Sequence, residues 1–353
     1  MRSAMPLAGA SVLRKHRFGI GALVRFLKRE WYTIAIVGMV VLASLLPIRG
    51  EAARGFDTAT TLAIALLFFL HGARLSRAVV IAGLTHWRLH IVILATTFVV
   101  FPVLGSAVFL MPGILPQALI TGIMFLCVLP STVQSSIAFV SIAKGNVPAA
   151  ICAASASNIL GMFITPLMCG VIFHSLGHGS GFSTDALVSI LLQLLVPFIA
   201  GQIVQPWLGS WFGRHKILTQ IVDRGSILMV VYAAFSEAVI GGIWHQISIG
   251  SLAIVLVLDA VLLAIVLVMT YFGSGWLGFN REDRITITFC GSKKSLASGA
   301  PMANVIFSGQ DVGAIVLPLM FFHQIQLMTC AVLARRFAAA VDADEATLKR
   351  AAE

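Results

Sequence analysis

The chain has 353 residues, of which 59% are hydrophobic and only 11% are charged, and its mean hydropathy is +0.97. A soluble domain carries about 25% charged residues, so this composition excludes an ordinary soluble protein. Because no stretch alternates like a membrane barrel strand, we predict an all-α polytopic membrane protein embedded in a lipid bilayer. The net charge of +10 then reports membrane topology, and we expect no nucleic-acid partner.

The first 30 residues mix basic and apolar side chains. They lack the short apolar core and small-residue cleavage site that a signal peptide has. We therefore interpret residues 1–30 as a basic cytoplasmic leader that lies on the membrane surface and is attracted to anionic lipid.

The remaining sequence predicts ten transmembrane helices at roughly 20 apolar residues each. Basic residues gather in alternate connections, at Lys144 and Arg281 for example, whereas Arg49 and Arg54 stand beside acids. The positive-inside rule then places both termini in the cytoplasm of a multi-pass protein of the cell (inner) membrane. The predicted spans are residues 31–47, 58–73, 88–110, 117–143, 147–172, 185–206, 219–241, 249–275, 285–307 and 312–334.

Ten spans divide into two repeats of five, at residues 31–172 and 185–336, followed by a cytoplasmic tail at 337–353. Because five is odd, the second repeat must insert upside down relative to the first. Inverted repeats of this kind are common in secondary transporters, whose discontinuous helices meet near the bilayer midplane. Spans four and nine should therefore both be interrupted.

Span four contains Pro130 in its middle. Proline removes a backbone hydrogen bond and clashes with the preceding turn, and exposed backbone at this depth must face protein or a watery cavity. The alternative is an ordinary proline kink. The polar side chains that would line the break are Ser131, Thr132, Gln134, Ser135 and Ser136.

Span nine contains two adjacent lysines, Lys293 and Lys294, flanked by Ser292 and Ser295. A lysine at the centre of a membrane helix costs about 2.5–3.5 kcal/mol on insertion scales. We therefore expect this helix to break around a polar site where it crosses span four.

Further polar side chains at membrane depth are candidates to support that site, although each can equally serve to lock helices together. Asp259 is the better placed acid to pair with a buried lysine. The supporting candidates are Ser155, Ser157, Asn158, Glu237, Asp259, His323 and Gln324.

Four segments together resemble the bile acid:sodium symporter superfamily, and specifically its divergent sodium–bile acid symporter-like branch, over residues 31–336. The resemblance implies ten helices, with a panel domain from spans 1, 2, 6 and 7 and a core domain from spans 3–5 and 8–10. It also implies that spans four and nine are broken and cross. The segments are Leu-Pro-Ser-Thr-Val-Gln-Ser-Ser at 129–136, Ala-Lys-Gly-Asn at 143–146, Phe-Cys-Gly-Ser-Lys-Lys-Ser-Leu at 289–296 and Pro-Leu-Met-Phe-Phe-His-Gln-Ile-Gln at 318–326.

The resemblance implies two sodium ions, held by a glutamate and a glutamine in span nine and by serine, asparagine and threonine in spans four and five. In this sequence Phe289 and Lys293 stand at the first two positions, and Ala150 and Ala154 fall where hydroxyls are expected. An ammonium only donates hydrogen bonds. Sodium coupling is therefore doubtful, no metal ligand is assigned with confidence, and no other cofactor is expected.

We expect a secondary transporter that moves a small organic solute, anionic or amphipathic, by alternating access. Lys293, with Lys294 sharing the role, would attract the anion or carry a proton. The alternative for the pair is a structural tether, with one lysine bound to span-four carbonyls and the other facing the cavity.

A membrane channel and a non-transporting regulator with a vestigial site are the competing functions. The sequence shows no nucleophile–base set, paired acids or metal cluster, so we do not expect an enzyme. The sequence indicates neither the oligomeric state nor which particular solute is carried.

Overall fold

The computed structural model describes residues 31–74, 86–110, 113–175, 184–242 and 247–352. Within these ranges the chain forms helices and turns and no strand. The predicted leader at 1–30 lies outside the described residues. The all-helical prediction is confirmed for the part of the chain that the structure describes.

Among the described residues, the first half of the chain contains nine helical segments, two of which are not α-helical. Segment η1 is a π-helix and η2 is a 3₁₀-helix, and both interrupt the apolar run that was predicted as the single span 88–110. In chain order the segments are α2 (Trp31–Leu45), α3 (Gly50–Arg74), α5 (Trp87–Ala95), η1 (Thr96–Val100), α6 (Phe101–Gly105), η2 (Ser106–Leu110), α7 (Gln117–Val128), α8 (Val133–Ile142) and α9 (Val147–Ser175).

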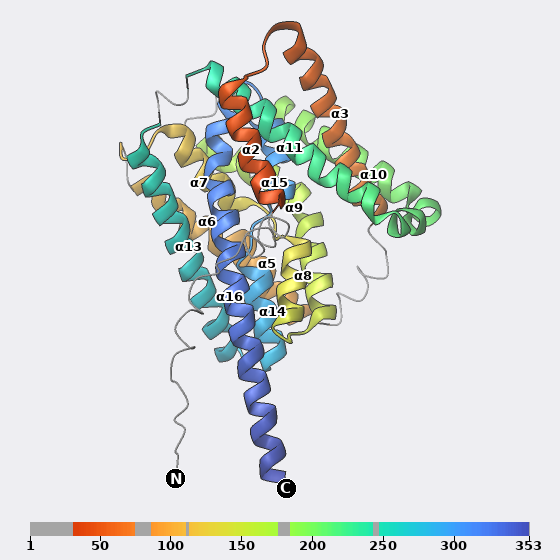
Figure 1. Cartoon of the computed structure of the whole chain (residues 1–353), viewed down its shortest axis with the longest axis vertical. Coiled ribbons are helices and arrows are strands. Elements are labelled where there is room, and N and C mark those ends of the chain that lie inside the picture. Colours follow the sequence, from red (N-terminus) through yellow and green to blue (C-terminus); the bar gives the residue numbers. More distant parts are fainter. Residues whose placement is uncertain (1–30, 75–85, 111–112, 176–183, 243–246, 353) are drawn as a thin grey trace, which may run out of the picture.

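The second half contains longer helices. The last helix runs on without a break through the residues predicted as a tail, and Figure 1 shows it extending beyond the other helices. The helices are α10 (Thr184–Arg214), α11 (Lys216–Ile240), α13 (Ile249–Trp276), α14 (Arg281–Gly291), α15 (Leu296–Ile306) and α16 (Val312–Ala352).

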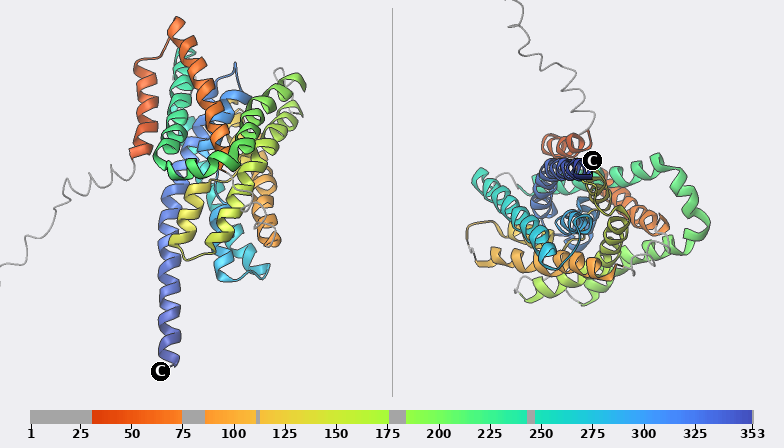
Figure 2. Two further views of the ribbon diagram at one scale, coloured as in Figure 1. Left: turned by 90° about the vertical axis from the view of Figure 1, so that its right-hand side faces the viewer. Right: turned by 90° about the horizontal axis from the view of Figure 1, so that it is seen from below.

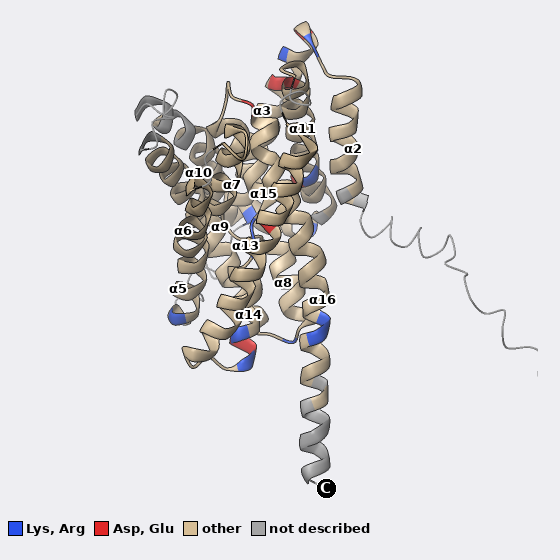
Figure 3. Cartoon of the chain, turned by 90° about the vertical axis from the view of Figure 1, so that its left-hand side faces the viewer, with Lys and Arg blue, Asp and Glu red and all other residues tan. Residues whose placement is uncertain are grey.

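Seven helices in the described ranges are long and apolar enough to cross a membrane, or eight if the bent pair α7 and α8 forms one span. The shorter helix at Ile34–Leu45 is also apolar. Most charged residues lie toward the two ends of the bundle, and few lie between them (Figure 3). This distribution is the one that a bilayer imposes, because charges at its centre are costly.

Both predicted interruptions are present. Helix α7 ends at Val128 and α8 begins at Val133, with an angle of 59° between them. Helix α14 ends at Gly291 and α15 begins at Leu296. In Figure 1, α2, α3, α10 and α11 lie toward the top, α5, α8 and α14 lie toward the bottom, and α16 runs along both groups. The left view in Figure 2, turned about the same vertical axis, shows the same separation.

Helices α3 and α10 pack closely because two glycines let their backbones touch. A Cβ atom at Gly72 would overlap the carbonyl oxygen of Phe198, and one at Gly201 would overlap that of Phe69. Small residues of this kind allow close helix association in membranes, where apolar burial alone supplies little force. The pair therefore forms a rigid wall beside the two interruptions.

Candidate functional site

The two interruptions meet and bond to each other. Pro130 cannot donate a backbone hydrogen bond, and its carbonyl instead accepts from the backbone N–H of Ser295 at 3.0 Å. Hydroxyls on the α7–α8 side donate to carbonyls freed by the other break. These bonds run from Ser131 to Cys290 at 2.6 Å, from Thr132 to Lys294 at 2.8 Å and from Ser136 to Phe289 at 3.3 Å.

The serines predicted to line the break therefore have different tasks. Ser131 and Ser136 are fully buried and bind backbone rather than face a cavity. Ser157 in α9 supports the first of them, because its oxygen accepts from the N–H of Ser131 at 3.0 Å. Ser135 lines the cavity described below, whereas Ser292 is fully buried.

Lys294 is completely buried, and its ammonium donates three hydrogen bonds to backbone carbonyls. The acceptors are Thr97 at 2.8 Å, Cys127 at 2.7 Å and Leu129 at 2.7 Å. The ammonium also lies 4.1 Å from the ring centroid of Phe101. Three donors meeting three acceptors satisfy this lysine in full.

Lys293 is equally buried but very differently surrounded. Its ammonium has no hydrogen-bond partner among the described residues. It lies 3.8 Å from the ring centroid of Phe139 in α8, which offers a cation–π contact. The cavity that the tether alternative predicted for the second lysine is not lined by Lys293.

Gln326 in α16 forms hydrogen bonds with the second interruption and also contacts a histidine. The Gln326 Oε1 accepts from the N–H of Lys294 at 2.9 Å, so the amide nitrogen must be the donor end. That nitrogen donates to the Lys294 carbonyl at 2.8 Å and lies 3.0 Å from His323 Nδ1. His323 Nδ1 is then an acceptor, and a neutral imidazole must carry its proton on Nε2.

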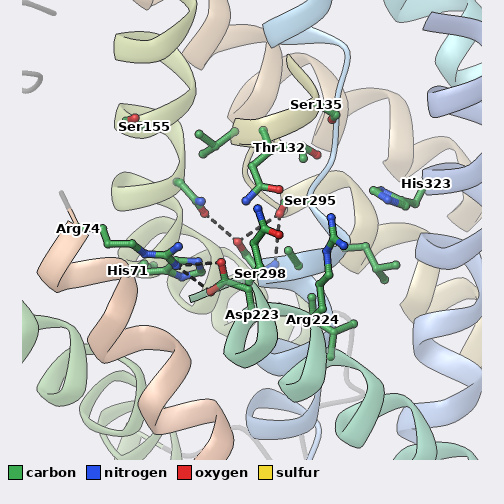
Figure 4. Close-up of a pocket in the computed structure, with 18 of the residues that line it drawn as sticks. His71, Arg74, Thr132, Ser135, Ser155, Asp223, Arg224, Ser295, Ser298 and His323 are labelled. Atoms are coloured by element: carbon green, nitrogen blue, oxygen red, sulfur yellow. Dashed lines mark hydrogen bonds and ion pairs between the residues drawn. The ribbon is translucent and has the colours of Figure 1, made fainter. Parts of the chain in front are cut away.

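A cavity of about 400 Å³ opens beside the crossing (Figure 4). The first residues of α8 and α15 line it, and so does His323. Thr132 gives α8 no side-chain cap, so the N–H groups of its first turn have no partner from that residue. The N-termini of helices carry partial positive charge and free donors, which suits an anion.

Helix α9 supplies the adjoining part of the wall. Ser298 donates to Asn158 Oδ1 at 2.8 Å, and both side chains line the cavity together with Ser155. Ser295 caps α15 by accepting from the N–H of Ser298 at 3.2 Å. Gln134 also lines the cavity.

The opposite wall comes from α2, α3 and α11, and sequence reasoning missed it. Arg74 holds Asp223 by two hydrogen bonds of 2.7 and 3.0 Å, and Figure 4 shows the pair facing the crossing. Arg224 lies 5.3 Å from the ring centroid of Tyr32 and lines the same cavity. Asp223 and Arg224 both fall inside the predicted span 219–241, and charges at that depth were the available signal.

The remaining predicted residues lie elsewhere. Asp259 is fully buried in α13 and forms no ion pair with either lysine among the described residues. Glu237 lines a second cavity, of about 670 Å³, together with Asp57. Gln324 is half-buried in α16 and lines neither cavity.

As far as the structure describes them, the cavity walls therefore combine two helix N-termini, two arginines and one acid, Asp223. This arrangement can hold and orient a small anion.

Comparison with known proteins identifies the family. The model of the SBF-like CPA transporter family matches residues 30–339. The chain is 54% identical over 322 residues to "Uncharacterized protein PA2026" of Pseudomonas aeruginosa, covering 91% of this chain and 96% of the relative. It is 52% identical over 307 residues to "Putative symporter YfeH" of Escherichia coli, covering 87% and 92%.

A more distant relative carries a solute in its name. The chain is 27% identical over 317 residues to "Sodium/bile acid cotransporter 7" of Mus musculus, covering 87% of this chain and 92% of the relative. These matches and the family model agree on a membrane transporter rather than an enzyme. The chain belongs to the SBF-like CPA transporter family.

Proposed function

We propose that the chain is a secondary transporter that moves a small organic anion by alternating access. The observation that carries this proposal is the composition of the cavity beside the crossing. Helices α8 and α15 both begin at this cavity, and Arg74 and Arg224 line its other wall together with Asp223. Its volume of about 400 Å³ matches the size of pockets that enclose small organic ligands.

A second cavity on the same helices supports alternating access. Both cavities are lined by α3, α10, α11, α15 and α16. The first contains the start of α15 and the second contains Asn304 and Val305 near its end. Eleven residues of helix separate these ends, which corresponds to about 16 Å. If the helices of the expected panel domain slide past those of the expected core domain, each cavity would open in turn.

The ten-span topology belongs to the same proposal. We group α5 to η2 into one span, α7 with α8 into another and α14 with α15 into a third, which gives ten spans in two inverted repeats. Both termini then lie in the cytoplasm of a bacterial inner membrane. A cysteine introduced for Arg281 should react only from the cytoplasmic side and one for Gln310 only from outside. The reverse pattern would overturn the topology.

The function is tested first by ligand binding. Purified protein is heated with small carboxylates, sulfonates and phosphates, and with matched cationic and neutral compounds. A ligand that binds only the folded protein raises its melting temperature by mass action. We expect stabilisation by a subset of anions and none by the cations.

The best anion is then used for uptake into proteoliposomes. Arg224→Gln should weaken its binding by roughly tenfold or more, because a charged hydrogen bond contributes about 1.5–3 kcal/mol. Arg336→Gln, on an exposed part of α16, is the control and should bind normally. Uptake that does not saturate would indicate a channel, and binding without uptake would indicate a regulator.

A further inference from the structure

Three backbone carbonyls converge where α5–α6, α7 and the second interruption meet. Thr97 lies in the π-helix η1, and Cys127 and Leu129 lie at the end of α7. A π-turn and a helix C-terminus both leave carbonyls without their usual helical partners. Inside a bilayer each of these groups needs another donor, since water is absent.

The Lys294 ammonium supplies all three donors at 2.7–2.8 Å. Converging carbonyls of this kind replace the hydration shell of a monovalent metal cation in channels. Here the positive charge is covalently attached to the chain and fully buried. The carbonyl site is therefore occupied by the protein itself.

The names of several relatives include sodium, so the fit of a sodium ion to this crossing can be tested. A sodium ion needs oxygen atoms that can turn lone pairs toward it. The carbonyls of Thr97, Cys127 and Leu129 already accept from the Lys294 ammonium. The carbonyls of Cys290 and Phe289 accept from Ser131 and Ser136. A sodium ion would have to displace a buried ammonium, which would then lose its acceptors. The residues present do not fit sodium at this place.

We propose that the Lys294 ammonium is a built-in cation that joins η1 and the end of α7 to the second interruption, so that no sodium ion is needed there. The part that concerns coupling rests on the proposed transport function. The structural part does not, because it concerns folding alone. The latent site is a carbonyl cage that would accept a monovalent cation once the lysine side chain is removed.

The experiment compares melting temperatures of purified protein in sodium, potassium and choline chloride at equal ionic strength. Wild type should melt at the same temperature in all three salts. Lys294→Met leaves three buried carbonyls without donors and should melt roughly 5–15 °C lower. Lys293→Met is the matched control, because its ammonium has no hydrogen bond to lose.

Lys294→Ala opens the space of the side chain. Adding sodium or n-propylammonium should then raise its melting temperature above the value in choline. A sodium-specific rise in wild type, or a Lys294→Met protein as stable as wild type, would overturn the proposal. If Lys294→Ala cannot be purified, the melting temperatures of wild type in the three salts and of Lys294→Met still decide whether the proposal holds. None of these readouts needs a transported solute, so failure of the anion screen would leave this proposal standing.

Discussion

Lys293 is the position at which stability and function should separate. Its buried ammonium carries the cost of a charge at membrane depth, about 2.5–3.5 kcal/mol. The contact with Phe139 at 3.8 Å returns about 0.5–2 kcal/mol. Lys293→Met removes both terms and keeps the length of the side chain. The free energy of unfolding should therefore stay level or rise by roughly 1–3 kcal/mol, a net that follows from these two terms.

The assay is thermal unfolding of the purified variant beside wild type in one detergent. At about 2–4 °C per kcal/mol, the expected melting temperature is equal to wild type or several degrees higher. The response to a stabilising anion should be lost. Lys293 contacts Phe139, which lies one helical turn after the cavity-lining Ser135 in α8. A fall in melting temperature as large as that of Lys294→Met would refute the reasoning, and so would an unchanged anion response.

Three further predictions concern the walls of the cavity. Gly72→Ala should lower the melting temperature, because its Cβ meets backbone of α10, whereas Gly225→Ala has nothing within 4 Å and should be neutral or slightly stabilising; equal effects would argue against the close approach. Arg74→Met and Asp223→Asn should each destabilise, and the double variant should cost less than their sum by about 0.5–3 kcal/mol; additive losses in SDS unfolding would exclude the pair. His323→Leu should weaken anion binding while His323→Gln, which keeps an N–H donor, should retain it; equal losses in the binding assay would show that the Nε2 proton is not used.

The interruptions were predictable because their causes are local. Pro130 lacks a backbone donor wherever it stands in a helix, and two lysines in an apolar run require polar surroundings. Both facts can be read from composition and spacing. In the structure the helices are accordingly interrupted at Leu129–Thr132 and at Ser292–Ser295.

The π-helix η1 was not predicted, although Pro102 lies two residues after it and lacks a backbone donor. What the sequence could not show is the partner of the carbonyl freed there, which lies far away in the chain. Residues 96–100 form an apolar and threonine run that resembles any membrane helix. The carbonyl of Thr97 is satisfied by Lys294, nearly two hundred residues later. The hydrogen bond between these two segments stabilises the irregular turn. The wall formed by Arg74 and Asp223 was missed for a related reason, since a charge near a span end reads as topology until its partner is known.

The two lysines show how far chemistry alone can carry such a prediction. The sequence identified both as a buried basic pair and favoured Lys293 as the group that attracts an anion or carries a proton, with a tether to span-four carbonyls as the alternative for the pair. In the structure the tethered ammonium is that of Lys294, while Lys293 points to an aromatic ring. The residues between α14 and α15 are not helical, so neighbouring side chains leave the backbone in different directions. A lysine with three acceptors can be explained by folding, whereas a buried lysine with none is a cost that folding does not explain. This asymmetry makes Lys293, rather than the better bonded Lys294, the residue whose retention calls for a functional reason.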